Sequence, residues 1–77
     1  MINNKIILKI LATELEIDIN SINTNDPYAG LENMDSLTQV SIINTIENEL
    51  EIEFDFDDLF DIEIVQDLLD IINSKLS

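Results

Sequence analysis

Apolar residues recur every three or four positions in three stretches of the chain, residues 3–15, 36–50 and 64–76. This spacing places apolar side chains along one helix face, so each stretch predicts an amphipathic α-helix. Residues 57–62 add one short helical turn. The pattern therefore predicts an all-α fold, a four-helix bundle with three main helices and one short helix. The residues expected to face the core are Ile6, Ile7, Ile10, Leu11 and Leu15 in the first stretch, Val40, Ile43, Ile46 and Leu50 in the second with Leu37 and Ile42 beside them, and Val65, Leu68, Leu69, Ile72 and Leu76 in the last.

The long segment between the first two predicted helices, residues 16–35, has the composition of a connection. It is rich in Asn, Asp, Ser and Thr and contains the only Pro and the only Gly of the chain, which favour turns. A connection of this length in a compact domain is usually functional or held against the core. The apolar residues available to hold it are Ile17, Ile19, Ile22, Tyr28 and Leu31.

Residues 51–56 alternate strictly between acidic and apolar side chains, which is the pattern of a β-strand. Because the pattern predicts no second strand to pair with it, we expect an extended connection instead. Its apolar side chains, Ile52, Phe54 and Phe56, should then face the core.

The composition indicates one small domain that spans residues 1–77. With 45% hydrophobic residues, the chain is too apolar for a disordered acidic tail. It contains no Cys and no His, which excludes a disulfide framework and argues against a structural zinc site.

The charge is strongly one-sided, because 17 acidic residues stand against three basic ones and give a net charge of -14. Such a surface repels nucleic acid and anionic membranes, so we expect neither as a partner. Two roles of the charge stay open, attraction of proteins that carry basic patches and solubility alone. The apolar stretch near the amino end is short and interrupted by Lys9, unlike a signal peptide or a membrane span. A cytoplasmic protein is therefore expected.

The acidic run that begins at Asp55 does not fit a calcium loop. An EF-hand starting there would place Leu59 where an oxygen ligand is needed and Phe60 where a Gly is needed. The chain also lacks a Gly-rich phosphate loop, a GxSxG turn and, without His, a Ser-His-Asp triad. We therefore expect no dedicated metal site and no catalytic residues, and we do not expect an enzyme.

Ser36 is the remaining candidate for chemistry. It lies in the run ENMDSLTQV, between the long connection and the second predicted helix. Ser36 and Gln39 have the spacing of a capping box, so Ser36 is expected to cap this helix. A helix start also presents free N–H groups and the positive end of the helix dipole, which suit a phosphate. The spacing is compatible with a cap and with an anchor for a phosphate-containing group.

The segment Asp35-Ser36-Leu37 resembles the Asp-Ser-Leu motif of acyl carrier proteins. As in that family, the motif opens the second helix, and the likeness continues through Ile-Glu-Phe at 52–54 and a Val-Gln pair at 65–66. Residues 35–73 align with the family pattern without a gap, and the first helix and long connection fit in length. The residues that continue the motif along the second helix are Val40, Ile42, Ile43, Ile46, Glu47, Glu49 and Leu50.

The resemblance implies a four-helix bundle with no catalysis of its own. A phosphopantetheinyl transferase would attach 4′-phosphopantetheine from coenzyme A to Ser36. Asp35 and Leu37 would lie at the attachment site, and Asp35 would help to position the enzyme and the phosphate region. The thiol of the arm would carry acyl or aminoacyl groups as thioesters, which explains how a chain without Cys can take part in thiol chemistry.

The resemblance also implies that the second helix is the main docking surface. The expected partners are the transferase and the enzymes that load and transfer acyl or aminoacyl groups, each with a basic docking patch. The carrier itself is expected to be a monomer. The candidate docking residues are Asp35, Leu37, Ser41, Glu47 and Glu49.

The segment before the motif departs from the family pattern, because Glu32 and Asn33 stand where many carriers have Leu and Gly. Asn is the next best residue after Gly for a positive φ, so the backbone turn can be kept. Leu31 or Met34 is available to fill the pocket of the missing Leu.

Two departures on the predicted docking helix bear on the pathway. Ser41 replaces an acid that is common in fatty-acid carriers, and Asn48 interrupts the acidic run. These differences favour a specialised carrier for polyketide, peptide or modified-acyl biosynthesis. A housekeeping carrier of fatty-acid synthesis is the alternative. A rival of another class is an acidic helical interaction module in which Ser36 only caps a helix.

Overall fold

The computed structural model describes residues 4–76 and confirms the predicted all-α architecture. Within these residues there is no β-strand, and no helix is long and apolar enough to cross a membrane. Residue 3, where the first helix was expected to begin, and the outermost residues of the domain predicted over 1–77 lie outside the described part. The elements are α1 (Asn4–Leu15), the 3-10 turns η1 (Ile19–Ser21) and η2 (Tyr28–Gly30), α2 (Ser36–Leu50), the short α3 (Phe56–Phe60) and α4 (Val65–Leu76).

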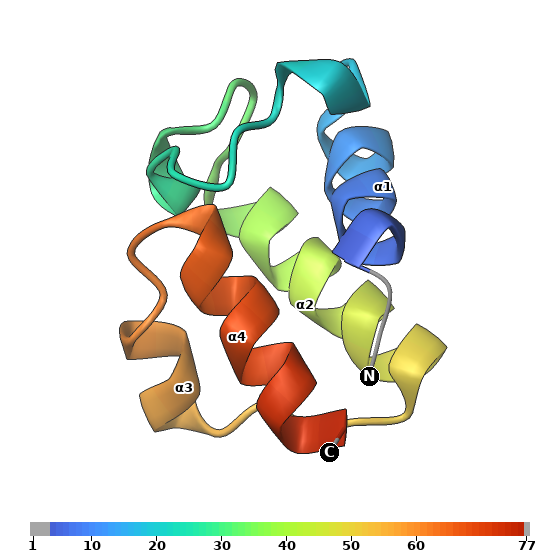
Figure 1. Cartoon of the computed structure of the whole chain (residues 1–77), viewed down its shortest axis with the longest axis vertical. Coiled ribbons are helices and arrows are strands. Elements are labelled where there is room, and N and C mark those ends of the chain that lie inside the picture. Colours follow the sequence, from blue (N-terminus) through green and yellow to red (C-terminus); the bar gives the residue numbers. More distant parts are fainter. Residues whose placement is uncertain (1–3, 77) are drawn as a thin grey trace.

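The helices surround one apolar core (Figure 1). Helices α1 and α2 lie side by side and run in opposite directions, while α4 runs in the same sense as α2. The short α3 lies beside α4. The buried cluster at the centre consists of Ile7, Leu11, Leu15, Tyr28, Leu31, Ile42, Ile46, Val65, Leu68, Leu69 and Ile72.

The predicted core face of α2 is confirmed at Ile43, Ile46 and Leu50 but not near the start of the helix. Ile42 and Ile46 are fully buried one turn apart, whereas Val40 is 59% exposed and Leu37 is 83% exposed. Because successive helical residues turn by about 100°, Val40 and Ile42 lie on nearly opposite sides of the helix. The expectation that Val40 faces the core with Leu37 beside it is therefore wrong.

Three other side chains expected in the core are exposed, namely Ile6, Phe56 and Leu76. Ile6 lies beside the buried helix face that carries Ile7. Leu76 ends α4, one turn beyond the buried Ile72. Phe56 opens α3, where the strand-like alternation of the preceding residues stops. The other predicted core residues are buried or pack partly buried against the cluster, as Ile10, Ile43, Leu50, Ile52 and Phe54 do.

The long connection is held to the start of α4 by backbone hydrogen bonds. The first N–H groups of a helix have no partners within it, and here two carbonyl groups of the connection accept them. A third bond runs the other way, from the connection to the residue two positions before α4. We call the following three bonds the loop–α4 clamp: Tyr28 N–H to Glu63 O (2.9 Å), Val65 N–H to Asp26 O (3.0 Å) and Gln66 N–H to Thr24 O (2.9 Å).

Side chains add to this attachment. Tyr28 and Leu31 are buried in the core, and Ile17 and Ile22 pack against it partly buried, as expected. Ile19 is half-buried and does not join the cluster. Side chains therefore attach the connection to the core at a few positions, in addition to the clamp.

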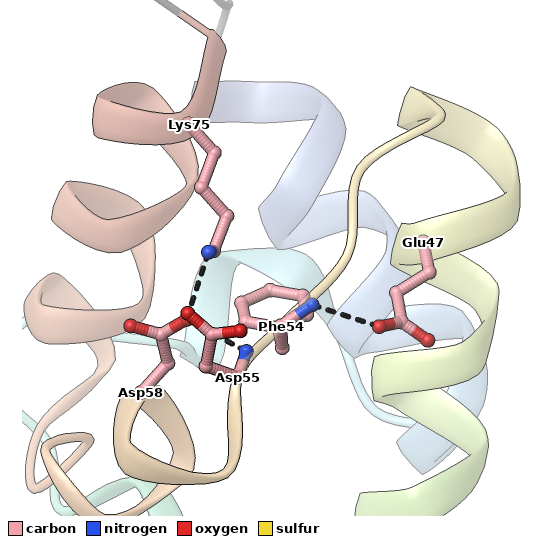
Figure 2. Close-up of polar contacts among 5 residues, drawn as sticks. All are labelled: Glu47, Phe54, Asp55, Asp58 and Lys75. Atoms are coloured by element: carbon pink, nitrogen blue, oxygen red, sulfur yellow. Dashed lines mark hydrogen bonds and ion pairs between the residues drawn. The ribbon is translucent and has the colours of Figure 1, made fainter.

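Helix α3 is fixed to α4 by an ion pair (Figure 2). Lys75 Nζ lies 2.8 Å from Asp58 Oδ2, which also accepts the N–H of Asp55 at 2.8 Å. Lys75 lies 5.9 Å from the ring centroid of Phe54. On the opposite side, Glu47 Oε2 accepts the N–H of Phe54 at 2.9 Å. The connection from α2 to α3 is therefore held from both sides. The expected absence of a strand is confirmed over residues 51–56, although Glu51 is left-handed and Phe56 already belongs to α3.

Candidate functional site

Ser36 is the first residue of α2, and its side chain is exposed. The cap of the helix is Asp35, whose backbone is extended (φ -143°, ψ 178°) and whose Oδ1 accepts the N–H of Thr38 at 2.7 Å. The expectation that Ser36 caps the helix in a box with Gln39 is therefore wrong. Asp and Ser are comparable cap residues, and the residue whose backbone is still extended takes the role. The cap does not use the Ser36 hydroxyl.

Hydrogen bonding at the cap lowers the pKa of the Asp35 carboxyl below its ordinary value of 3.8, chiefly through the backbone N–H of Thr38. The carboxylate is the form that accepts this bond, so the bond favours ionisation. A negative charge at this position also complements the positive end of the α2 dipole. Asp35 thus fixes where α2 begins and places Ser36 in its first turn.

Asn33 shapes the turn that leads into α2. Its φ of 68° is positive, which confirms that the backbone turn of the Gly position is kept. Its Nδ2 also donates to the carbonyl oxygen of Leu15 at 2.8 Å, at the end of α1 where helix carbonyls lack partners. Glu32 is exposed, while Leu31 is buried and Met34 packs partly buried against the core. The apolar side chains on both sides of the Glu32-Asn33 pair therefore pack in or against the core.

A cavity of about 570 Å³ opens beside Ser36, and α2, α3 and the clamped connection all contribute to its walls. Most of the wall is apolar, which suits a hydrophobic group more than an ion. The lining residues are Tyr28, Ala29, Ser36, Gln39, Val40, Ile43, Asn44, Glu47, Phe54, Leu59 and Ile62.

Tyr28 has a second role as part of this wall. It is only 6% exposed, and burial raises the pKa of its phenol to about 12, so the group is neutral at physiological pH. Its Oη has no hydrogen-bond partner within residues 4–76. The sequence indicated Tyr28 as an anchor of the connection but not as part of a cavity next to Ser36.

The docking residues expected on α2 differ in their surroundings. Leu37 and Glu49 are exposed. Ser41 Oγ donates to Glu14 Oε2 of α1 at 3.0 Å, and Glu47 accepts a backbone N–H from the connection that follows α2. Ser41 and Glu47 therefore also hold the fold together.

Val40 is a candidate surface residue that the sequence interpretation missed. It lies one turn after Ser36 and three residues after Leu37, and residues with these spacings share a helix face. The available signal was the position of Ser36. If a partner is to reach Ser36, then the residue one helical turn later on the same face, Val40, should be at the surface as well. Ser36, Leu37 and Val40 form what we call the α2 patch.

The acidic run around α3 does not form a metal site. Across residues 4–76, no group of acidic side chains is arranged to hold a metal ion. Asp58, at the centre of this run, is paired with Lys75.

Comparison with known proteins gives two matches that include the α2 patch. The family model described as "Phosphopantetheine attachment site" matches residues 5–72. A protein named "Acyl carrier protein" from Thermosynechococcus vestitus (strain NIES-2133 / IAM M-273 / BP-1) is 32% identical over 68 residues, which cover 88% of this chain and 84% of that protein. The family match begins in α1 and ends in α4, so it includes all of α2 and α3.

The variant Asp35→Ala should lower the melting temperature by about 5 °C at pH 7, because it removes the side-chain cap of α2. Asp35→Asn is the matched control, since Asn keeps the acceptor without the charge and should retain most of the stability. Thermal unfolding followed by circular dichroism measures both.

The pH dependence gives a second readout of the same bond. A lowered folded-state pKa stabilises the fold above the unfolded-state value, and this contribution is lost as the pH falls through the folded-state pKa. The difference in melting temperature between wild type and Asp35→Ala should therefore become smaller in acid. Equal melting temperatures for the two proteins at pH 7 would contradict the assignment of Asp35 as the cap.

Proposed function

Because the chain belongs to the phosphopantetheine attachment site family, and is thus a carrier protein rather than an enzyme, we propose that Ser36 is the residue that receives the 4′-phosphopantetheine arm. One observation carries this proposal. Within the Asp35-Ser36-Leu37 motif, Ser36 opens α2 with an exposed side chain that the helix cap does not use. A modifying enzyme can reach such a hydroxyl without unfolding the chain.

The surroundings of Ser36 fit a phosphodiester. The first turn of a helix carries a partial positive charge and N–H groups that attract phosphate. The neighbouring carboxylate of Asp35 is turned toward the N–H of Thr38, which offsets part of its repulsion. No basic residue lies in α2, so the helix start itself supplies the attraction.

The transfer to Ser36 follows simple phosphoryl chemistry. The Ser36 oxygen passes its proton to a base of the transferase and bonds to the pantetheine-side phosphorus of coenzyme A. The P–O bond of the pyrophosphate bridge breaks, and adenosine 3′,5′-bisphosphate leaves with that bond's electron pair. When bound, the arm supplies the thiol on which acyl groups are carried as thioesters. The apolar walls of the cavity beside Ser36 support a further role of this chain, which is to shield an apolar acyl group from water.

The proposed partners are a phosphopantetheinyl transferase and enzymes that load and transfer acyl or aminoacyl groups. Leu37 and Val40 offer exposed apolar area beside Ser36, and Glu49 offers exposed charge. The net charge of -14 favours partners with basic docking patches. Ser41 and Glu47 are proposed as secondary contacts, because their side chains already bond within the fold.

The attachment residue is tested by intact mass after incubation of the purified chain with coenzyme A and a broad-specificity phosphopantetheinyl transferase. Wild type should gain the mass of one phosphopantetheine unit, and Ser36→Ala should gain none. Ser21→Ala is the matched control, since Ser21 is an exposed serine in the long connection, and it should be modified like wild type. Modification of Ser36→Ala, or no modification of wild type, would contradict the proposal.

We further propose that the carrier serves a specialised pathway for polyketide, peptide or modified-acyl products rather than fatty-acid synthesis. Ser41 stands where fatty-acid carriers commonly have an acid, and its hydroxyl, which donates to Glu14, offers a partner no charge. Asn48 is exposed and interrupts the acidic run on α2. Charge differences of this kind on a docking surface select among partners.

Replacement of the fatty-acid carrier in a bacterial strain tests this choice. The chain is expressed while the strain's own carrier is shut off, and intact mass verifies that the chain carries the arm. We expect the arm to be present and growth to fail, because the acidic contacts that fatty-acid enzymes read are incomplete. Growth restored to the level given by the strain's own carrier would assign the chain to fatty-acid synthesis.

A further inference from the structure

Two phenylalanine side chains of α3 are exposed next to each other. Phe56 is 76% exposed and Phe60 is 73% exposed. Their ring centroids lie 5.3 Å apart and their planes are inclined by 49°, so the rings contact in a tilted arrangement. Adjoining large apolar side chains on a protein surface mark an interaction site more often than single ones do. We call these two residues the α3 aromatic pair.

The pair faces outward because of the way α3 is attached to α4. Asp58, in the middle of α3, points toward Lys75 of α4 and lies 2.8 Å from it (Figure 2). Phe56 and Phe60 are each two positions from Asp58, which places them about 160° to 200° around the helix from it. They therefore project from the side of α3 opposite to the ion pair.

The pair rests on a well-fixed support. The Asp58 carboxylate holds both Lys75 and the N–H of Asp55, and Lys75 lies over the ring of Phe54. These contacts hold α3 in place without help from the aromatic pair. The two rings are thus arranged in advance, which lowers the entropy lost when a partner binds them.

The charge around the pair indicates what kind of partner it suits. Asp57 and Asp61 lie next to the pair and are exposed. A second copy of this chain has the same net charge of -14, so two such surfaces repel each other, and an anionic membrane is repelled as well. A protein surface with basic side chains is attracted instead. The carboxylates of this region are Glu51, Glu53, Asp55, Asp57, Asp58, Asp61 and Glu63, and residues 51–63 contain no basic residue.

We propose that the α3 aromatic pair is a docking anchor for a partner protein whose surface has an apolar cleft bordered by Lys and Arg side chains. The rings of Phe56 and Phe60 enter the cleft, and Asp57 and Asp61 face its basic rim. This contact surface lies on a different helix from the α2 patch, and it does not depend on Ser36 as the attachment residue.

Photo-cross-linking with the full chain tests the proposal in cells that make the protein. Benzoylphenylalanine replaces Phe56, and in a matched control it replaces Ile6, an exposed apolar residue of α1. We expect position 56 to cross-link to another protein, identified by mass spectrometry, that position 6 does not capture. Equal cross-linking at both positions, or a second copy of this chain as the product, overturns the proposal.

Affinity measurements with the identified and purified partner complete the test. The double variant Phe56→Ser/Phe60→Ser should bind about tenfold more weakly or worse, as expected for loss of aromatic anchors, while Ile6→Ser should bind like wild type. Asp57→Asn/Asp61→Asn should slow association and reduce its salt dependence. Because both rings are exposed, the double variant should keep the wild-type circular dichroism spectrum. A partner that binds the phenylalanine double variant as tightly as wild type overturns the proposal.

Discussion

The loop–α4 clamp is the interaction on which the placement of Ser36 depends. The connection between α1 and α2 is long, and side chains such as Tyr28 and Leu31 anchor it at only a few points. The clamp gives the first N–H groups of α4 the partners that a helix start lacks, and it fixes the connection by the same bonds. Asn33 ties the other side of the connection to the end of α1. Ser36 comes three residues after Asn33, so these two attachments fix the position of the chain where it enters α2.

The α2 patch and the core-facing residues of α2 lie on different sides of the same helix. Ile42 and Ile46 face the core, while Ser36, Leu37 and Val40 face outward. Asp35 takes the structural task of capping, so the cap does not use the hydroxyl of Ser36, the attachment residue that we propose. A chain without Cys or His can serve as a carrier in this way, because it supplies position and charge while the attached group supplies the thiol.

Periodicity predicted the three main helices well, because amphipathic spacing is a local property that survives folding. It was wrong at the start of α2, where Leu37 and Val40 are exposed, since so many apolar residues occur in this helix that two overlapping stripes compete. The cap was assigned to Ser36 rather than Asp35 because both residue types are good caps, and only the backbone dihedral distinguishes them. The clamp could not be predicted, because its bonds join backbone groups of distant segments and leave no trace in side-chain type.

Amide hydrogen exchange of Tyr28, Val65 and Gln66 tests most directly whether the connection that leads to Ser36 is held by α4. Each of these N–H groups donates one bond of the clamp. Exchange should therefore be slowed to rates near those of the buried amides of α2, such as Ile42 and Ile46, because opening requires the same loss of structure. Exchange of the three amides at the rate of an unprotected loop would contradict the account.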